Sequence, residues 1–228
     1  MRRRTPRSNH RQWLFLQVLL ALLIVAMMIE LWLPAVKRWG SELKYRLPIT
    51  QNGREIQRAL RVWAADHQGV YPAGATANAA FRHLFVDGVV EREEIFGAFG
   101  SPFQPDGYTG VGGQGLGVIG EPVLGRGENH WMLTAGQTDA APGRLPLVFE
   151  NGLTPSWPPL WNAAVDGQAV RGRTWGGGKV LVVMADGSAE VVRMEEVGSA
   201  ASQPEGGASG KDVFQSALRS AQVLDVED

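Results

Sequence analysis

The stretch WLFLQVLLALLIVAMMIELWLP, from Trp13 to Pro34, decides the fold class of this chain. As a helix, residues 13–33 span about 30 Å, which is the thickness of the hydrocarbon core of a bilayer. A cleaved export signal has a shorter apolar region that ends in small residues, whereas this stretch ends in Ile-Glu-Leu-Trp-Leu-Pro. The sequence therefore predicts a retained transmembrane helix over residues 13–33.

The charges on the two sides of this helix predict its orientation. Residues 1–12 carry five arginines and no acid, and the far flank has a smaller basic excess. Because the more basic flank of a membrane helix stays in the cytoplasm, we expect residues 1–12 to form a basic cytoplasmic head. The rest of the chain then lies outside the cytoplasm.

The remaining chain has the composition of one globular domain. With the five head arginines set aside, residues 13–228 hold 17 basic and 23 acidic residues, a formal charge of −6. A mildly acidic body argues against nucleic acid as a partner. The chain has no cysteine, which excludes disulfides, a thiol nucleophile and a cysteine-ligated metal. Residues 34–197 are sufficient to bury one core.

Two amphipathic helices are predicted in this domain. Residues 52–66 carry an apolar stripe at helical spacing, with Asn52 as the expected N-cap and Pro34 and Pro48 as candidate breaks before it. A second, shorter helix is expected within residues 78–96. The apolar positions of the two helices are Ile56, Leu60, Trp63 and Ala64 in the first, and Phe81, Leu84 and Phe85 in the second.

Two β-branched runs near residue 186 predict a β-hairpin. Val180–Met184 and Ala189–Val192 flank Asp186-Gly187, a pair that type I′ turns favour because both central residues need a positive φ. Other short apolar pieces, HWMLTA and RLPLVFE, are also expected to be strands. The predicted fold class is α+β, with a long N-terminal transmembrane helix packed on a small antiparallel β-sheet.

The C-terminal residues divide into a linker and a helix. Residues 198–211 are rich in Gly, Ser and Ala, which predicts a flexible linker. Residues 212–228 carry an apolar stripe that includes Phe214 and Leu218 and predict an amphipathic helix. Such a helix either folds back on its own domain or docks on a partner, and the stripe does not distinguish the two.

The order of these parts resembles a type IV pilin-like or type II secretion pseudopilin-like protein. The similarity lies in the basic head, the apolar helix ending in Leu-Pro-Ala-Val, the segment NGREIQRALRVWAADHQGVYP and the late Asp-Gly-Ser hairpin. Prepilin-like proteins of planctomycete- and verrucomicrobia-type bacteria share this late hairpin. The resemblance implies a pilin-like stem, a bacterial inner-membrane location with a periplasmic domain, and other pilin-like or secretion-system proteins as partners.

The chain departs from the family at its processing positions. Aligning Pro34 with the usual stem proline puts Gln12 where a glycine precedes the cleavage point, Trp13 at the new terminus and Gln17 in place of a glutamate. That glutamate pairs within the bilayer with the freed amine of a neighbouring subunit, which Gln17 cannot neutralise. The stretch is therefore expected to be a permanent anchor with residues 1–12 retained.

Catalytic and metal motifs are weak. Ser101, Ser188 and Ser199 lack a G-x-S-x-G elbow, and the pairs His130–Glu128 and His83–Asp87 stand alone, so the sequence predicts no catalytic, cofactor or metal residues. By family analogy Asp106 and Asp139 are candidates for a calcium ion, although the spacing of a dedicated calcium loop is missing. Residues 109–122 contain a G-x-G-like pattern that Pro122 separates from any helix.

These patterns favour a non-enzymatic, membrane-anchored pilin-like subunit or accessory factor of a type II secretion or type IV pilus-like system. Its expected partners are the membrane and related proteins, through residues 13–33 and 212–228. The alternative is an anchored extracytoplasmic binding module that keeps the pilin architecture and no longer assembles.

Overall fold

The computed structural model describes residues 9–107, 123–162, 168–173, 178–193, 203–204, 213–217 and 219–227. The chain forms two units, Met1–Lys44 and Tyr45–Asp228. Helix α1, Asn9–Asp66, contributes its first part to one unit and its last part to the other. Helix α1 runs through both candidate breaks, Pro34 and Pro48; a proline inside a helix removes one backbone hydrogen bond and can kink the helix without ending it.

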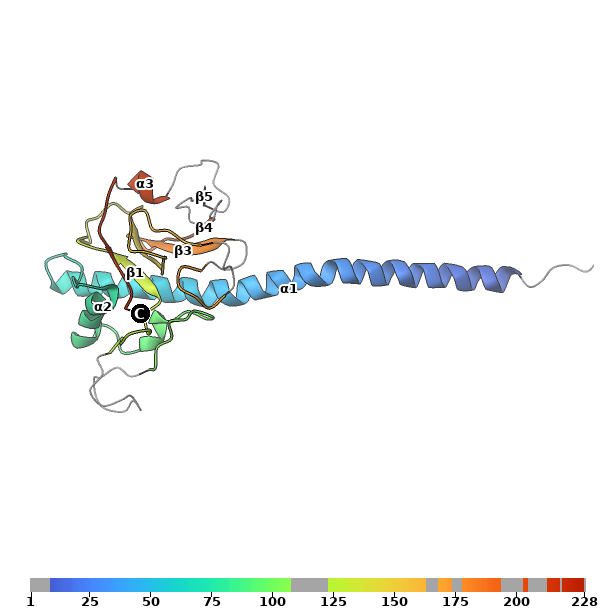
Figure 1. Ribbon diagram of the computed structural model, residues 1–228, viewed down its shortest axis with the longest axis horizontal. Coiled ribbons are helices and arrows are strands. Elements are labelled where there is room, and N and C mark those ends of the chain that lie inside the picture. Colours follow the sequence, from blue (N-terminus) through green and yellow to red (C-terminus); the bar gives the residue numbers. More distant parts are fainter. Residues whose placement is uncertain are drawn as a thin grey trace, which may run out of the picture. The chain divides into compact units, whose positions relative to one another are not determined.

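The second unit is an antiparallel sheet with α1 and α2 on one face and the short helix α3 on the other. Its strand order is β5-β4-β3-β2-β1-β6, and Figure 1 shows the sheet beside the last part of α1. The strands are β1 Trp131–Thr134, β2 Pro146–Glu150, β3 Lys179–Met184, β4 Ala189–Arg193, β5 Gln203–Pro204 and β6 Val223–Leu224. The helices after α1 are α2 Ala77–Val86, the 3-10 helix η1 Glu93–Phe96 and α3 Val213–Ala217. The α+β class with an apolar N-terminal helix and a small antiparallel sheet is thus confirmed.

Apolar cores cover both faces of the sheet. On one face, Leu181 and Val183 of β3 pack with the predicted stripe of α1 and the apolar face of α2. On the other face, Val180 and Val182 pack with Phe214 of α3. Because successive side chains of a strand alternate between faces, a strand buried on both faces carries a continuous apolar run, as KVLVVM does. The stripe residues Ile56, Leu60 and Ala64 are buried as predicted, whereas Trp63 is only partly buried and packs against this core. The predicted residues of the second helix, Phe81, Leu84 and Phe85, are buried.

Gly53 lets α1 approach the sheet closely. A Cβ at Gly53 would lie 2.8 Å from Val183 Cγ2 and 2.9 Å from Trp131 Cη2. One turn later, the buried side chain of Gln57 donates a 2.7 Å hydrogen bond to the carbonyl of Ala185. Asn52 is not an N-cap, since α1 continues through it, and its amide instead bonds the carbonyl of Gly97.

The predicted hairpin is present, but its turn is not type I′. Gly187 has φ +84, and the Gly187 N–H donates to the carbonyl of Met184, whereas Asp186 is not among the residues with positive φ. The loop therefore has three residues, and only its last one adopts the left-handed conformation, as in a type I turn with a G1 bulge. The carboxylate of Asp186 accepts the Ser188 N–H at 2.8 Å, which satisfies the turn locally.

The short helix expected within residues 78–96 is α2, Ala77–Val86, with Phe81, Leu84 and Phe85 on its buried face. It ends after Val86, Gly88 turns the chain at φ +68, and a separate 3-10 helix follows at Glu93–Phe96. Glycine takes this conformation without steric cost. Residues 87–92, between α2 and η1, form a turn beside α1.

The predicted C-terminal helix over residues 212–228 is wrong. Helix α3 has only five residues, and Val223 and Leu224 form β6, which pairs with Thr134 and Leu133 of β1. The free edge of β1 offers backbone groups that only a strand can satisfy. The buried Phe214 and Val226 show that the tail folds back on its own domain. In the predicted linker, Gln203–Pro204 pair with β4; residues 198–202 and 205–211 lie outside the described residues.

Candidate functional site

The apolar part of α1 is the first candidate. Trp13–Glu30 has a mean hydropathy of 2.4 and is long and apolar enough to cross a membrane. Every side chain from Trp13 to Glu30 is exposed in its unit, and a helix that is apolar all round is typical of a membrane span. Trp13 and Gln17 are four residues apart and share a face. Gln12 belongs to α1, but its side chain lies outside the described part of the chain.

The second candidate is a group of carboxylates around Glu93. Oxygens of Glu93, Asp106 and Glu128 all lie within 4.8 Å of one another. Glu93 is fully buried and its two oxygens accept backbone N–H groups from Leu124 at 2.6 Å and from Gly107 at 3.0 Å. The single carboxylate thus ties together two segments that are distant from it in the sequence.

Burial raises the pKa of Glu93 to about 7, and the charges of Glu128 and Asp106 act in the same direction. The N–H groups of Leu124 and Gly107 oppose this by stabilising the charged form. Leu124, whose N–H binds Glu93, is itself held by further contacts. Leu124 has φ +51, an uncommon conformation for a bulky side chain, and its carbonyl accepts hydrogen bonds from Asn78 and Arg82.

The three carboxylates carry six oxygens, and three of these already accept backbone N–H groups, so fewer are left than the six to eight that calcium takes. The expected calcium pair is not brought together at this cluster, because Asp139 lies instead against Gly69, after the end of α1. Glu128 Oε2 also accepts the N–H of Gly125. The cluster in the described residues is a set of acids held mainly by backbone N–H groups.

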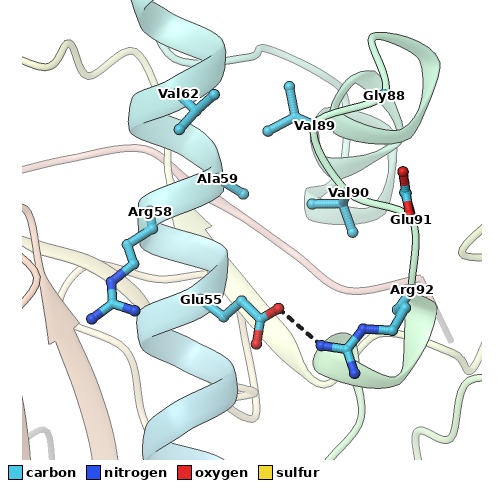
Figure 2. Close-up of a pocket in the computed structure, with 9 residues that line it drawn as sticks. All are labelled: Glu55, Arg58, Ala59, Val62, Gly88, Val89, Val90, Glu91 and Arg92. Carbon is cyan, nitrogen blue, oxygen red and sulfur yellow. Dashed lines mark hydrogen bonds and ion pairs between the residues drawn. The ribbon is translucent and has the colours of Figure 1, made fainter.

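The third candidate is a groove between α1 and the turn that follows α2. It has a volume of about 400 Å³, and Figure 2 shows its α1 wall and its turn wall. Arg92 Nη2 and Glu55 Oε1 form an ion pair of 3.1 Å across it. The apolar residues that line it are Ala59, Val62, Val89 and Val90. Val62 remains 57% exposed, so this wall presents apolar surface to solvent.

His130 is the centre of a buried polar network. Ser101 Oγ lies 2.8 Å from His130 Nδ1, and Glu150 Oε1 lies 3.0 Å from His130 Nε2. Asn151 Nδ2 is also 2.8 Å from His130 Nδ1. The three types of residue match a hydrolase triad, but Ser101 is 5% exposed and His130 1%. The arrangement is buried and links β1, β2 and the loop at residue 101.

The other predicted residues are dispersed. His83 does not pair with Asp87 in an ion pair; instead His67 Nε2 lies 3.4 Å from the Asp87 carboxylate, which also accepts the Trp63 indole N–H at 2.6 Å. Asp186 and Gly187 form the hairpin turn, as expected of turn residues. Ser199 and residues 109–122 lie outside the described residues.

Sequence reasoning missed Glu93, Glu150 and Gln57. Each is a polar residue within a predicted helix or strand, where exposure is the usual expectation. The only available signal was their position on an apolar face. Gln57 lies three residues before Leu60 and seven before Ala64, on the apolar face of its helix, and Glu150 ends an apolar strand.

Comparison with known proteins gives no relative: no family model, no curated protein and no solved structure matches the chain.

Proposed function

We propose that this chain is a non-enzymatic, membrane-anchored pilin-like subunit or accessory factor of a type II secretion or type IV pilus-like system. Residues 13–33 cross a bacterial inner membrane once, with residues 1–12 in the cytoplasm and the α+β domain on the periplasmic side. The observation that carries the proposal is α1 itself. A single helix of 58 residues begins with an apolar segment and ends as the core helix of an antiparallel α+β domain.

Charge supports the orientation, and the buried Ser101–His130–Glu150 network supports a non-enzymatic role. The five arginines of the head precede the apolar segment directly. The hydroxyl of Ser101 has the neighbours of a nucleophile, but Ser101 is buried. The domain therefore acts as a surface for binding other proteins.

The experiment that tests the topology is protease treatment of spheroplasts that carry the full chain with a tag before Met1. External protease is expected to degrade the domain and leave the tag with the apolar segment. A protected domain would contradict the proposal. Mass spectrometry of the membrane-purified chain is expected to find residues 1–12 retained, except for the initiator methionine. A chain that begins at Trp13 would contradict permanent anchoring.

The alternative is an anchored binding module that does not assemble. Gln12 and Gln17 favour this alternative, because they replace the residues that processing and assembly use. A test for contacts between copies of the chain separates it from the proposal. Because the chain has no cysteine, a single Val25→Cys variant reports contacts between apolar segments. Cross-linked pairs of chains are expected, and Gln17→Leu should reduce them, since a hydrogen bond between membrane helices contributes about 1 kcal/mol. Absence of cross-links in the membrane would favour the binding module.

A further inference from the structure

The last part of α1 carries a row of exposed arginines. Arg54, Arg58 and Arg61 lie at i, i+4 and i+7 and therefore share one face of the helix. All three are exposed, and none forms an ion pair with any residue that the structure describes. We call these three residues the arginine stripe.

The opposite charge lies on Glu91, in the turn after α2, and on Glu94, in the 3-10 helix η1 that follows it. Glu91 and Glu94 are exposed, and neither has an ion-pair partner among the described residues. Glu93 lies between them in the sequence, is buried and points into the domain. The exposed carboxylates of Glu91 and Glu94 therefore lie on the outer surface of the domain. We call Glu91 and Glu94 the acidic turn.

These two surfaces do not neutralise each other within one chain. In Figure 2 the side chain of Arg58 points away from the turn, while Glu91 lies on the far side of the groove. The pair that does cross the groove is Glu55–Arg92, which removes one charge of each sign. One domain thus presents two complementary charged surfaces, with the exposed Val62 next to the stripe.

We propose that the arginine stripe of one copy of this chain binds the acidic turn of a second copy. The two surfaces differ, so the contact is head-to-tail and leaves one stripe and one turn free for further copies. Guanidinium groups bind carboxylates in a bidentate geometry that fixes orientation. Val62 adds apolar area beside the charges.

The contact goes beyond the proposed function, since it uses the folded domain and no part of the apolar segment. An anionic lipid surface is the competing occupant of the stripe. Lipid headgroups would engage the arginines and leave the acidic turn without a role, whereas a second copy uses both surfaces. The observations therefore favour the second copy.

Charge reversal in the full chain, purified in detergent, tests the proposal. The wild type is expected to form cross-linkable oligomers that high salt disperses, because exposed charges are screened. The triple variant Arg54→Glu/Arg58→Glu/Arg61→Glu and the double variant Glu91→Arg/Glu94→Arg should each lose these oligomers. Mixing the two variants should restore them, because each supplies the charge that the other lacks. The restored assembly also shows that both variants are folded.

A matched control changes the net charge elsewhere. Arg126→Glu/Arg193→Glu/Arg219→Glu replaces three other exposed arginines by glutamates, the same change in charge as in the triple variant, and should leave the oligomers unchanged. If this control disperses them to the same extent, net charge rather than the stripe is responsible and the proposal is wrong. Unchanged oligomers in the triple variant, or a mixture that fails to restore them, would also overturn it.

Single cysteines test the geometry of the contact. Ala65 is exposed one turn beyond Arg61 on the same face of α1, so Ala65→Cys reports on the stripe and Glu91→Cys reports on the acidic turn. Mixed chains are expected to form the Ala65→Cys/Glu91→Cys disulfide in preference to either symmetric pair. Dominant symmetric pairs would overturn the head-to-tail contact.

Nanodiscs of phosphatidylcholine and of phosphatidylglycerol separate the two occupants. The mixed disulfide should form in both. The proposal is overturned in favour of lipid if Ala65→Cys becomes protected from a maleimide only in phosphatidylglycerol while no disulfide forms. These readouts are independent of cross-linking at Val25→Cys, so failure here and failure of the proposed function can be distinguished.

Discussion

Replacing Gly53 by alanine tests how closely α1 packs on the sheet. The new Cβ would lie 2.8 Å from Val183 Cγ2 and 2.9 Å from Trp131 Cη2, well inside the roughly 3.5–4.0 Å separation that carbon atoms prefer. Val183 and Trp131 are buried, and both lie within the sheet. The neighbours therefore have little freedom to move, and the helix or the strands must shift.

Two effects of opposite sign determine how much Gly53→Ala changes the free energy of unfolding. Overpacking a core costs about 1–3 kcal/mol, while alanine in a helix interior is about 1 kcal/mol more favourable than glycine. We expect Gly53→Ala to lower the free energy of unfolding by about 1 kcal/mol. For a chain of this size the same loss lowers the Tm by roughly 2–4 °C.

The assay is urea unfolding of the full chain in detergent, followed by near-ultraviolet circular dichroism. Ala65→Gly is the matched control, because Ala65 is exposed on the same helix and its replacement measures the propensity difference alone, about 1 kcal/mol. If Gly53→Ala stabilises the chain by as much as Ala65→Gly destabilises it, the close approach of α1 to β3 is wrong.

Three further predictions concern the turn, the tail and the buried acid. Gly187→Val should cost about 1–2 kcal/mol, because a β-branched residue resists φ +84; an unchanged urea midpoint would contradict the turn. Phe214→Ala should cost about 3–5 kcal/mol, since Phe214 is 1% exposed; unchanged stability would show that the tail is not docked. Burial raises the pKa of Glu93 from 4.5 to about 7, so the folded state holds this proton more tightly than the unfolded chain does. Stability should then fall by at most about 3 kcal/mol as the pH rises from 4.5 to 7, and Glu93→Gln should lack this fall; equal pH profiles would refute the shift.

Features set by neighbours in the sequence were predictable. The stripes of α1 and α2 and the β3–β4 hairpin are fixed by periodicities of 3.6 and 2 over a few residues, and the structure has them. The turn type was not predictable from Asp186-Gly187 alone. The same dipeptide fits a two-residue loop and a three-residue loop, and the pairing of Val183 with Ala189 decides between them.

Features set by distant contacts were not predictable. The apolar stripe of residues 212–228 fits a helix, yet Val223 and Leu224 form a strand because β1 has a free edge. The buried Glu93 has the local sequence of an exposed acid. Its partners, Gly107 and Leu124, are separated from it by 14 and 31 residues. Burial of such a group depends on backbone N–H donors that only the folded chain supplies.

The composition of α1 changes where its surroundings change. Over Trp13–Glu30 apolar residues occupy every face and Glu30 is the only charged residue, which suits a lipid environment on all sides. From Tyr45 onward one face holds Ile56, Leu60 and Ala64 in the core, and the opposite face holds the arginine stripe. A face that needed only solubility could alternate acids and bases and gain from pairs four residues apart. Instead its three arginines are spaced to lie together, which favours a binding surface over a merely solvated one.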